Sequence, residues 1–334
     1  MTYLEMQTAK QVATDKLIAK MESQVFKAYK QRRDEVLEVL KTNYAKYLVG
    51  VPQADYYSTL SLYNRLQTME KEIKGVYVTL SKESTRAIVA GQTEVFSDAY
   101  YRSQFSTTFF ADTIGTDIKF QALNPLIQKL SVTGDVSILK DIRDKAMHKI
   151  ANGMLPPSGV TLTSLLTAND TAGLVKVLRV VKSGLISGES YAKQVVKVKN
   201  QFDKNVSNAS KVIRTEGNRN LNAGSYLNTV DMREQGVKSR RKWLSTLDSV
   251  TRDSHRSLDG VYEDENGLWW IGSDSARYPL DFSDPSNSIG CRCTTIDVVE
   301  GLEPQLRRGV DPVTGKSDIA SYRDYETWKK NGLK

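Results

Sequence analysis

Three side chains that bind soft metal ions gather in one stretch of the chain, between Trp243 and Cys293. The sequence holds only two cysteines and two histidines, and this stretch contains both cysteines, Cys291 and Cys293, together with His255. Zinc in proteins prefers four tetrahedral nitrogen, sulfur or oxygen ligands. Asp248, Asp253 or Asp259 from the same stretch could complete the set, and Asp253 is taken as the candidate ligand. One interpretation of this stretch is therefore a zinc site that ties its two ends together.

The same residues also fit readings without metal. Two buried cysteines can behave as small apolar side chains beside a histidine that is hydrogen-bonded to a carboxylate. Asp253 and His255 together could transfer protons, but no serine or cysteine nucleophile motif accompanies them. An esterase or a protease is therefore disfavoured, and metal ligation and a metal-free buried cluster stay open as alternatives.

Charged side chains of alternating sign flank the histidine. We expect Asp248 and Arg252 to belong to an internal network that orients the imidazole, with a solvated surface cluster as the alternative. Upstream, Arg214 and Glu216 lie in a predicted helix. We expect that helix to pack and pair against the C-terminal part through these two residues, and an interaction surface is the other interpretation.

The charge of the chain is unevenly distributed. The formal net charge is +8; Lys and Arg are in excess over residues 204–256, whereas Asp and Glu are in excess over residues 257–303. Either these two segments face each other and partly neutralise, or the basic one contacts the phosphates of duplex DNA without sequence preference. The candidate DNA-binding residues are the densest basic run, Lys238, Arg240, Arg241 and Lys242.

Long helices are expected in the N-terminal part. Residues 5–48 contain no Gly or Pro, and their apolar residues recur at helical spacing; residues 56–110 repeat the pattern. Two long helices joined by a short turn predict an antiparallel hairpin. Shorter helices are expected between 117 and 152, then over 170–183, from about 190 toward 208, and over 209–234.

Short strands are expected after Gly236. Residues 238–246 and 294–299 are predicted strands, and residues 261–262 and 268–271 are predicted to form a hairpin through Asn266-Gly267. The tryptophans of this part are expected to build its core. The tail past Glu300 is expected to be irregular, with one terminal helix near 322–330.

The predicted fold is α+β and mainly helical. An elongated helical N-terminal region (1–155) precedes a compact domain of helices packed on a small antiparallel sheet (156–300) and a C-terminal tail (301–334). The clearest linker is residues 156–159, Pro-Pro-Ser-Gly. No apolar run approaches the roughly 20 residues that span a bilayer.

Two motifs of this chain carry a family resemblance. WLSTLDSVTRDSHRSLDG is followed by YPLDFSDPSNSIGCRC, and upstream SGLISGESYAKQVV precedes ASKVIRTEGNRNLNAG. In this order, over about residues 182–299, they resemble the phage Mu protein F-like family, the minor head or head-morphogenesis proteins of tailed bacteriophages.

The resemblance implies a minor capsid protein in the virion, inside the capsid near the portal and assembled in the host cytoplasm. It implies the portal protein as a partner, with scaffolding and major capsid proteins as further ones, and a role in handling or ejecting packaged DNA. It implies no enzymatic activity. We expect the N-terminal region to attach the protein to the portal.

Two other functional classes stay open. One is a metal-dependent nuclease or toxin-type enzyme that uses His255 with Cys291 and Cys293. The other is a non-specific DNA-binding module without a capsid role.

Overall fold

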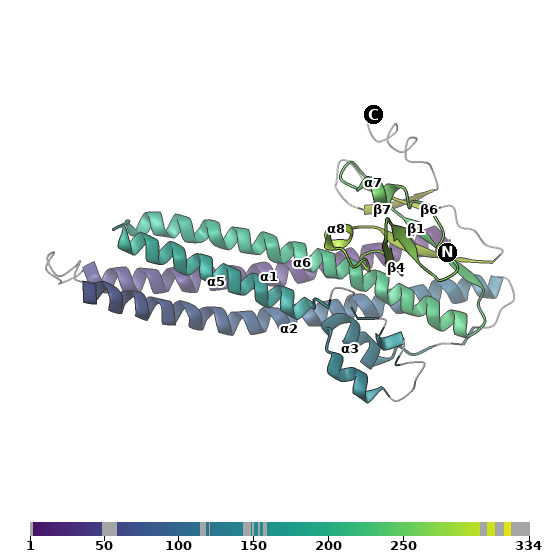
Figure 1. Ribbon diagram of the computed structural model, residues 1–334, viewed down its shortest axis with the longest axis horizontal. Helices are drawn as coiled ribbons and strands as arrows, with labels where there is room; N and C mark the ends of the chain where they lie inside the picture. The colour runs from purple at the N-terminus through teal and green to yellow at the C-terminus, as the bar shows by residue number, and fades with distance from the viewer. Residues whose placement is uncertain are drawn as a thin grey trace. The chain divides into compact units, whose positions relative to one another are not determined.

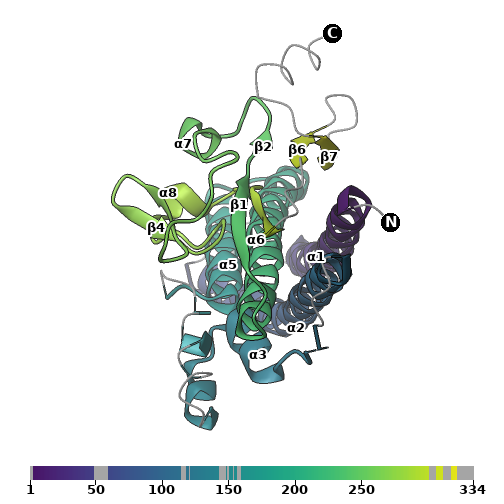
Figure 2. The same cartoon turned by 90° about the vertical axis from the view of Figure 1, so that its right-hand side faces the viewer.

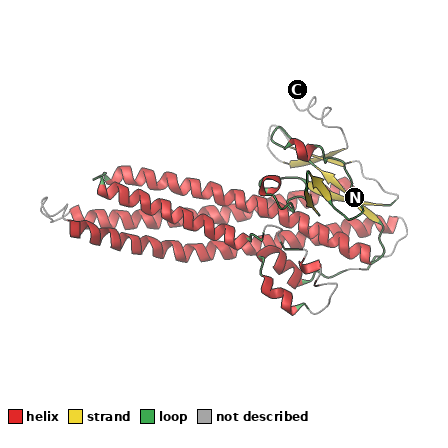
Figure 3. Ribbon diagram, in the orientation of Figure 1, coloured by secondary structure: helices red, strands yellow, loops and turns green. Residues whose placement is uncertain are grey.

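The computed structural model describes residues 3–48, 59–113, 118–119, 121–142, 148, 150–152, 154–155, 159–300, 306–310 and 317–321. Helix predominates, and the strands all follow Gly236 (Figure 3). The mainly helical α+β fold is therefore confirmed. No helix among the described residues is long and apolar enough to cross a membrane. The predicted terminal helix near 322–330 lies outside the described residues.

Four long helices dominate the chain: α1 (Tyr3–Leu48), α2 (Thr59–Thr113), α5 (Leu162–Ile186) and α6 (Tyr191–Glu234). The chain divides into two compact units, and α1, α2 and α6 each contribute residues to both. Unit 1 comprises residues 1–19, 90–162 and 214–334; unit 2 comprises residues 20–89 and 163–213. The structure thus divides the chain differently from the predicted boundary at 155/156.

Unit 2 is a bundle of four helical segments, one from each long helix, which lie side by side in two orthogonal views (Figures 1 and 2). Its core follows the predicted apolar spacing: Met21, Val25, Tyr29, Val36 and Leu40 of α1 are all buried. The helices α1 and α2 are antiparallel, because Asn43 contacts Glu72 (3.0 Å) whereas Lys10, earlier in α1, contacts Ser103, later in α2 (3.2 Å). This confirms the predicted helical hairpin within the described residues.

The bundle core also contains a buried ion pair. Arg32, which interrupts the apolar stripe of α1, has no exposed side-chain surface and donates from Nη1 to Asp170 Oδ1 at 2.8 Å. Its guanidinium lies over the rings of Tyr29 and Tyr77, 4.7 and 4.8 Å from their centroids. A buried charge is tolerated only when it is paired and hydrogen-bonded, so α5 must present Asp170 at this level of the bundle.

Unit 1 contains the other ends of α1, α2 and α6 with two short elements, α3 (Pro125–Thr133) and the 3₁₀ helix η1 (Val136–Asp141). The helices α6 and α2 approach closely, because a Cβ at Gly224 would overlap the carbonyl oxygen of Phe96 and meet the Cβ of Ala99 at 3.2 Å. Only glycine permits this contact.

Three small sheets complete unit 1. The strand β1 (Ser239–Leu244) pairs with β5 (Thr294–Val299) in antiparallel register, from Ser239 opposite Val299 to Leu244 opposite Thr294. The strand β2 (Thr246–Leu247) pairs in parallel with β6 (Leu306–Val310), which pairs with β7 (Ser317–Ser321). The tail is therefore not wholly irregular, and one strand pair is parallel rather than antiparallel.

Two further expectations are corrected. The helix α6 is continuous through residues 208 and 209, where two helices were expected. The predicted hairpin does not form either: β3 (Trp269–Ile271) pairs with β4 (Asp274–Ala276), while Tyr262 forms an isolated bridge with Lys242. Asn266-Gly267 is a tight turn, closed by the Gly267 amide donating to Asp264 O at 2.9 Å, but it does not connect paired strands.

Candidate functional site

The structure brings His255, Cys291 and Cys293 together inside unit 1. His255 lies on the short helix α7 (Asp253–Arg256), and the two cysteines immediately precede β5. His255 Nδ1 is 3.5 Å from Cys291 Sγ and 3.6 Å from Cys293 Sγ, and the three donor atoms lie within 4.8 Å of one another. The exposed fractions are 1%, 3% and 1% in the same order. We call these three residues the His–Cys cluster.

Aromatic rings wall the His–Cys cluster. The imidazole meets Trp243 edge-on at 6.0 Å between centroids and lies 6.2 Å from Phe282, and Trp243 packs against Trp269 at 5.5 Å. The prediction that tryptophans build this core is confirmed for Trp243 and Trp269. Trp270 is the exception, since it is half exposed and donates its indole N–H to Asp264.

Hydrogen bonds from α6, from β2 and from Ser245, which directly precedes β2, fix the backbone that carries the His–Cys cluster. Asn222 of α6 donates from Nδ2 to the Cys293 carbonyl at 3.0 Å. Thr246 of β2 donates to the Arg292 carbonyl at 2.7 Å, and Ser245 donates to the His255 carbonyl at 2.5 Å. These bonds fix the backbone at His255 and at Arg292–Cys293. The imidazole nitrogen and the two sulfurs are therefore positioned by the fold itself.

The two thiols have different acidities. A hydrogen bond with Cys291 lowers the pKa of the Cys293 thiol well below its ordinary value, against burial, and His255 acts in the same direction. The same thiol–thiol hydrogen bond, with burial, raises the pKa of Cys291. The geometry thus favours one thiolate, at Cys293, beside a neutral thiol.

Asp248 and Arg252, which were predicted to orient the imidazole of His255, make their contacts with other residues. Asp248 pairs with Arg292 at 2.5 Å, and Arg252 donates to the Ile289 carbonyl at 2.6 Å. Asp253, the candidate fourth ligand, has a side chain that is 95% exposed and pairs with Arg256 at 2.8 Å. Asp253 stands in the first turn of α7, which directs its carboxylate to solvent, so it does not belong to the His–Cys cluster.

The helix α6 does pack against this region, but the hydrogen bonds that show it come from Asn222 and Thr229 and not from Arg214 and Glu216. Asn222 receives a hydrogen bond from Thr294 at 2.9 Å, and Thr229 donates to Asp297 at 2.7 Å. Glu216 is buried and pairs with Arg219 at 2.7 Å, while Arg214 is exposed. Asparagine and threonine on a helix face carry no distinctive sequence signal, which is why these contacts were missed.

The candidate DNA-binding residues are mostly used inside the fold. Arg241 is 1% exposed, and its Nε donates to Glu263 Oε2 at 2.8 Å. Lys242 is 7% exposed with its ammonium 5.2 Å over the Tyr262 ring, which Arg240 also covers at 4.7 Å. Burial along β1 does not alternate, because Arg241, Lys242, Trp243 and Leu244 are all buried. Arg241 and Lys242 therefore cannot serve as a phosphate-binding surface in this fold.

Glu263 is a structural residue that the sequence did not single out. Besides Arg241 it receives a hydrogen bond from Arg233. Burial raises the pKa of Glu263, but the charges of Arg241 and Arg233 outweigh burial and hold that pKa below its ordinary value. The carboxylate therefore stays ionised as the counter-ion of both arginines.

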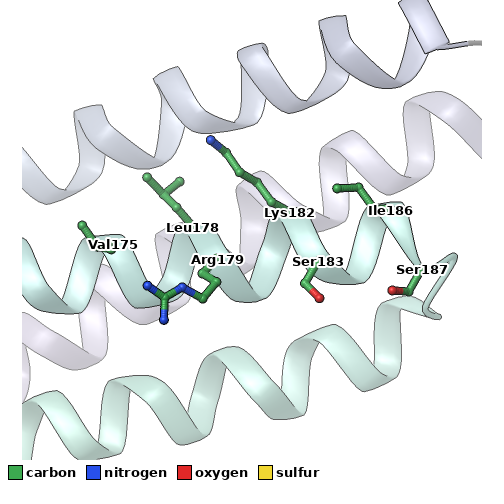
Figure 4. A pocket seen from close by; sticks show the side chains of 7 residues that line it. All are labelled: Val175, Leu178, Arg179, Lys182, Ser183, Ile186 and Ser187. Carbon is green, nitrogen blue, oxygen red and sulfur yellow. The ribbon is translucent and has the colours of Figure 1, made fainter.

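A shallow groove runs along α5 in unit 2, and Figure 4 shows the side chains that line it. Apolar Val175, Leu178 and Ile186 alternate there with Arg179 and Lys182. Lys182 is held by Glu70 of α2 at 2.6 Å. The lining residues come from a single helix, so this groove is a surface depression and not an enclosed site.

Comparisons with known proteins point to phage heads. Residues 175–296 match the family model described as Phage Mu protein F like protein. The chain is 23% identical to the Minor head protein GP7 of Bacillus phage SPP1 over 322 residues, which cover 95% of this chain and 94% of that protein. No solved structure gives a significant match.

A second curated relative is similar over a shorter segment. The chain is 31% identical to the NAD(+)–arginine ADP-ribosyltransferase EFV of Enterococcus faecalis over 146 residues, 44% of this chain. The chain covers only 29% of that protein's length. The resemblance to the phage Mu protein F-like family is confirmed by the family model and the phage relative together.

Proposed function

We propose that this chain is a minor head protein of a tailed bacteriophage, a component of the virion that takes part in head morphogenesis. The observation that carries the proposal is the end-to-end similarity to a phage minor head protein, over 95% of this chain and 94% of the relative. The family match over residues 175–296 supports the same role. A similarity that extends through the long helices as well as the His–Cys cluster argues for a shared role of the whole chain.

The finer part of the proposal concerns location and partners. We place the protein inside the capsid, attached to the portal, in a particle assembled in the host cytoplasm with scaffolding and major capsid proteins. Exposed apolar side chains on α1 and α2 support attachment through the helical region: Phe26 is 57% exposed and Val78 is 56% exposed. Apolar positions along exposed helices are the anchors of helix-in-groove docking.

Procapsid incorporation tests this proposal. The chain is co-produced with the portal, scaffolding and coat proteins of its own phage, and procapsids are purified and analysed for it. Phe26→Glu with Val78→Glu should lower its copy number severalfold. Val250→Glu is the control, because Val250 is 74% exposed in unit 1. Normal incorporation of the double variant would assign attachment to another surface, and absence of the unchanged chain from procapsids would contradict the head-protein role.

The proposal assigns no catalytic activity to this chain. The transferase relative is matched over less than a third of its own length, so its activity is not carried over. A nuclease that used the His–Cys cluster would have to admit a phosphodiester to atoms that are 1–3% exposed behind Trp243 and Phe282. Burial of the candidate site therefore disfavours the nuclease or toxin-type alternative.

Contact with packaged DNA is a separate part of the proposal. The net charge of +8 attracts a polyanion at moderate salt. Lys238, just before β1, and Arg240, near the start of β1, are the exposed members of the basic run. We assign to them the contribution that the buried Arg241 and Lys242 cannot make.

A further inference from the structure

The spacing of the donor atoms in the His–Cys cluster matches the edges of a metal tetrahedron. With zinc–sulfur bonds of about 2.3 Å and zinc–nitrogen bonds of about 2.0–2.1 Å, a sulfur and a nitrogen on one tetrahedral ion lie about 3.6 Å apart. The observed Nδ1–Sγ distances are 3.5 Å to Cys291 and 3.6 Å to Cys293. One imidazole nitrogen is therefore equidistant from two sulfurs, at the separation that a shared ion would impose.

Hydrogen bonding accounts for only one of the two Nδ1–Sγ contacts. Nδ1 carries at most one proton, so it cannot donate to both sulfurs at full strength. The imidazole packs against the rings of Trp243 and Phe282, with centroid distances of 6.0 and 6.2 Å. Gathering three polar donors in an apolar pocket is unfavourable unless something satisfies them together, and a cation at their centre does so.

The chemistry of the donors selects the ion. Thiolate and imidazole ligands favour zinc over the hard cations magnesium and calcium, which take oxygen ligands. The carboxylates nearest in sequence are engaged elsewhere, Asp248 with Arg292 and Asp253 with Arg256. The described residues therefore supply three ligands, and a non-protein ligand such as water takes the fourth position.

We propose that His255 Nδ1, Cys291 Sγ and Cys293 Sγ bind one zinc ion, which joins α7 to the segment that enters β5. The contacts of Asn222, Thr246 and Ser245 hold the two backbone segments at the required separation. The ion then closes the loop between His255 and Cys293 from within the aromatic core. Its role is structural, since the burial that shields it also keeps substrates away.

Metal analysis of the full chain, purified without a histidine tag under reducing conditions, tests this. About one zinc per chain is expected, and Cys293→Ser or His255→Ala should reduce it to below about 0.2. His148→Ala is the matched control: His148 is the other histidine and is exposed, so zinc content should stay unchanged.

A second measurement does not depend on whether the variants fold. Unchanged protein stripped of zinc and loaded with cobalt(II) should show thiolate-to-cobalt charge transfer in the near ultraviolet and the intense visible bands of a tetrahedral site. Added zinc should displace the cobalt and abolish both. Zinc below about 0.2 per chain together with no thiolate–cobalt absorption would overturn the proposal in favour of a metal-free thiol–imidazole cluster. This result is independent of procapsid incorporation.

Discussion

In unit 1, Arg241 and Glu263 form a buried ion pair, and each charge compensates the other. The guanidinium lies between the rings of Tyr226 and Trp269, 4.7 and 4.9 Å from their centroids, where water cannot solvate it. Glu263 receives hydrogen bonds from the Arg241 side chain and also from its backbone amide at 2.8 Å. Removing one partner of such a pair leaves the other charge buried without compensation.

Glu263→Gln should therefore lower the free energy of unfolding at pH 7 by about 3–5 kcal/mol, the usual effect of breaking a buried pair from one side. The measurement is urea unfolding followed by tryptophan fluorescence. Asp253→Asn is the control, because it breaks an ion pair whose carboxylate is 95% exposed and should change stability by less than about 1 kcal/mol. Equal effects of the two substitutions would contradict the role given to Glu263.

The same residue gives a pH dependence. The pKa of Glu263 is lower in the folded chain than its ordinary value of 4.5. Its stabilising contribution is therefore fully present above pH 4.5 and is lost as pH falls through the lower folded pKa. The stability difference between the unchanged chain and Glu263→Gln should stay constant from pH 7 to pH 5 and narrow below pH 4.5. A difference that widens on acidification would mean that the folded pKa is raised.

At the scale of elements, the contact of α6 with α2 depends on a missing side chain. A Cβ at Gly224 would overlap the backbone of Phe96, which belongs to a helix and cannot move alone. Gly224→Ala should destabilise the fold by about 1–3 kcal/mol through overpacking, although alanine is the better helix former. Gly75→Ala on α2 is the matched control: apart from its own helix neighbours, no atom lies within 4 Å of the added Cβ, so stability should rise by about 0.5–1 kcal/mol. Thermal unfolding of both variants decides the point, and a stabilising Gly224→Ala would show that the helices separate readily.

The elements with long apolar periodicity were predictable, and those set by tertiary contacts were not. The helices α1 and α2 were predictable from spacing alone, because apolar residues that recur every three or four positions over many turns indicate an α-helix. The break expected near residue 208 does not exist: α6 runs through it, and Asn205 is buried with its carbonyl accepting from Asn169 Nδ2 of α5 at 3.4 Å. Tyr262 bridges Lys242 of β1, and β3 pairs with β4 instead of with residues 261–262.

The candidate site was predictable in composition but not in geometry. Scarce cysteines and a histidine in one stretch pointed to His255, Cys291 and Cys293, and the structure brings these together. Asp253, two residues before the histidine, could not be rejected from the sequence, since the orientation of a single-turn helix decides where its carboxylate points. The burial of Arg241 also depends on Glu263, which lies 22 positions away in a turn-rich segment.

At the scale of the whole molecule, the positive charge predicts salt-sensitive binding to duplex DNA. The logarithm of affinity should fall linearly with the logarithm of salt concentration, with a slope near −0.9 per phosphate neutralised. Lys238→Gln with Arg240→Gln should flatten this slope by about 1–2 if those side chains contact phosphates. Lys27→Gln with Lys30→Gln removes the same charge from exposed positions of α1 and is the control. Equal slopes for both variants would indicate diffuse attraction by the net charge instead of a defined contact surface.

The division of α1, α2 and α6 between two units also sets the order in which the chain can fold. Lys10 donates hydrogen bonds to Ser103 and to Ser225, the latter 215 positions further along the chain. At translation rates of about 5–20 residues per second, the N-terminal segment waits roughly 10–40 s for that partner. During this time its apolar face is uncovered. Each unit combines N-terminal residues with residues from the second half of the chain, so neither can form until most of the chain has been synthesised. We therefore expect this protein to fold late and slowly, and to need chaperones during synthesis.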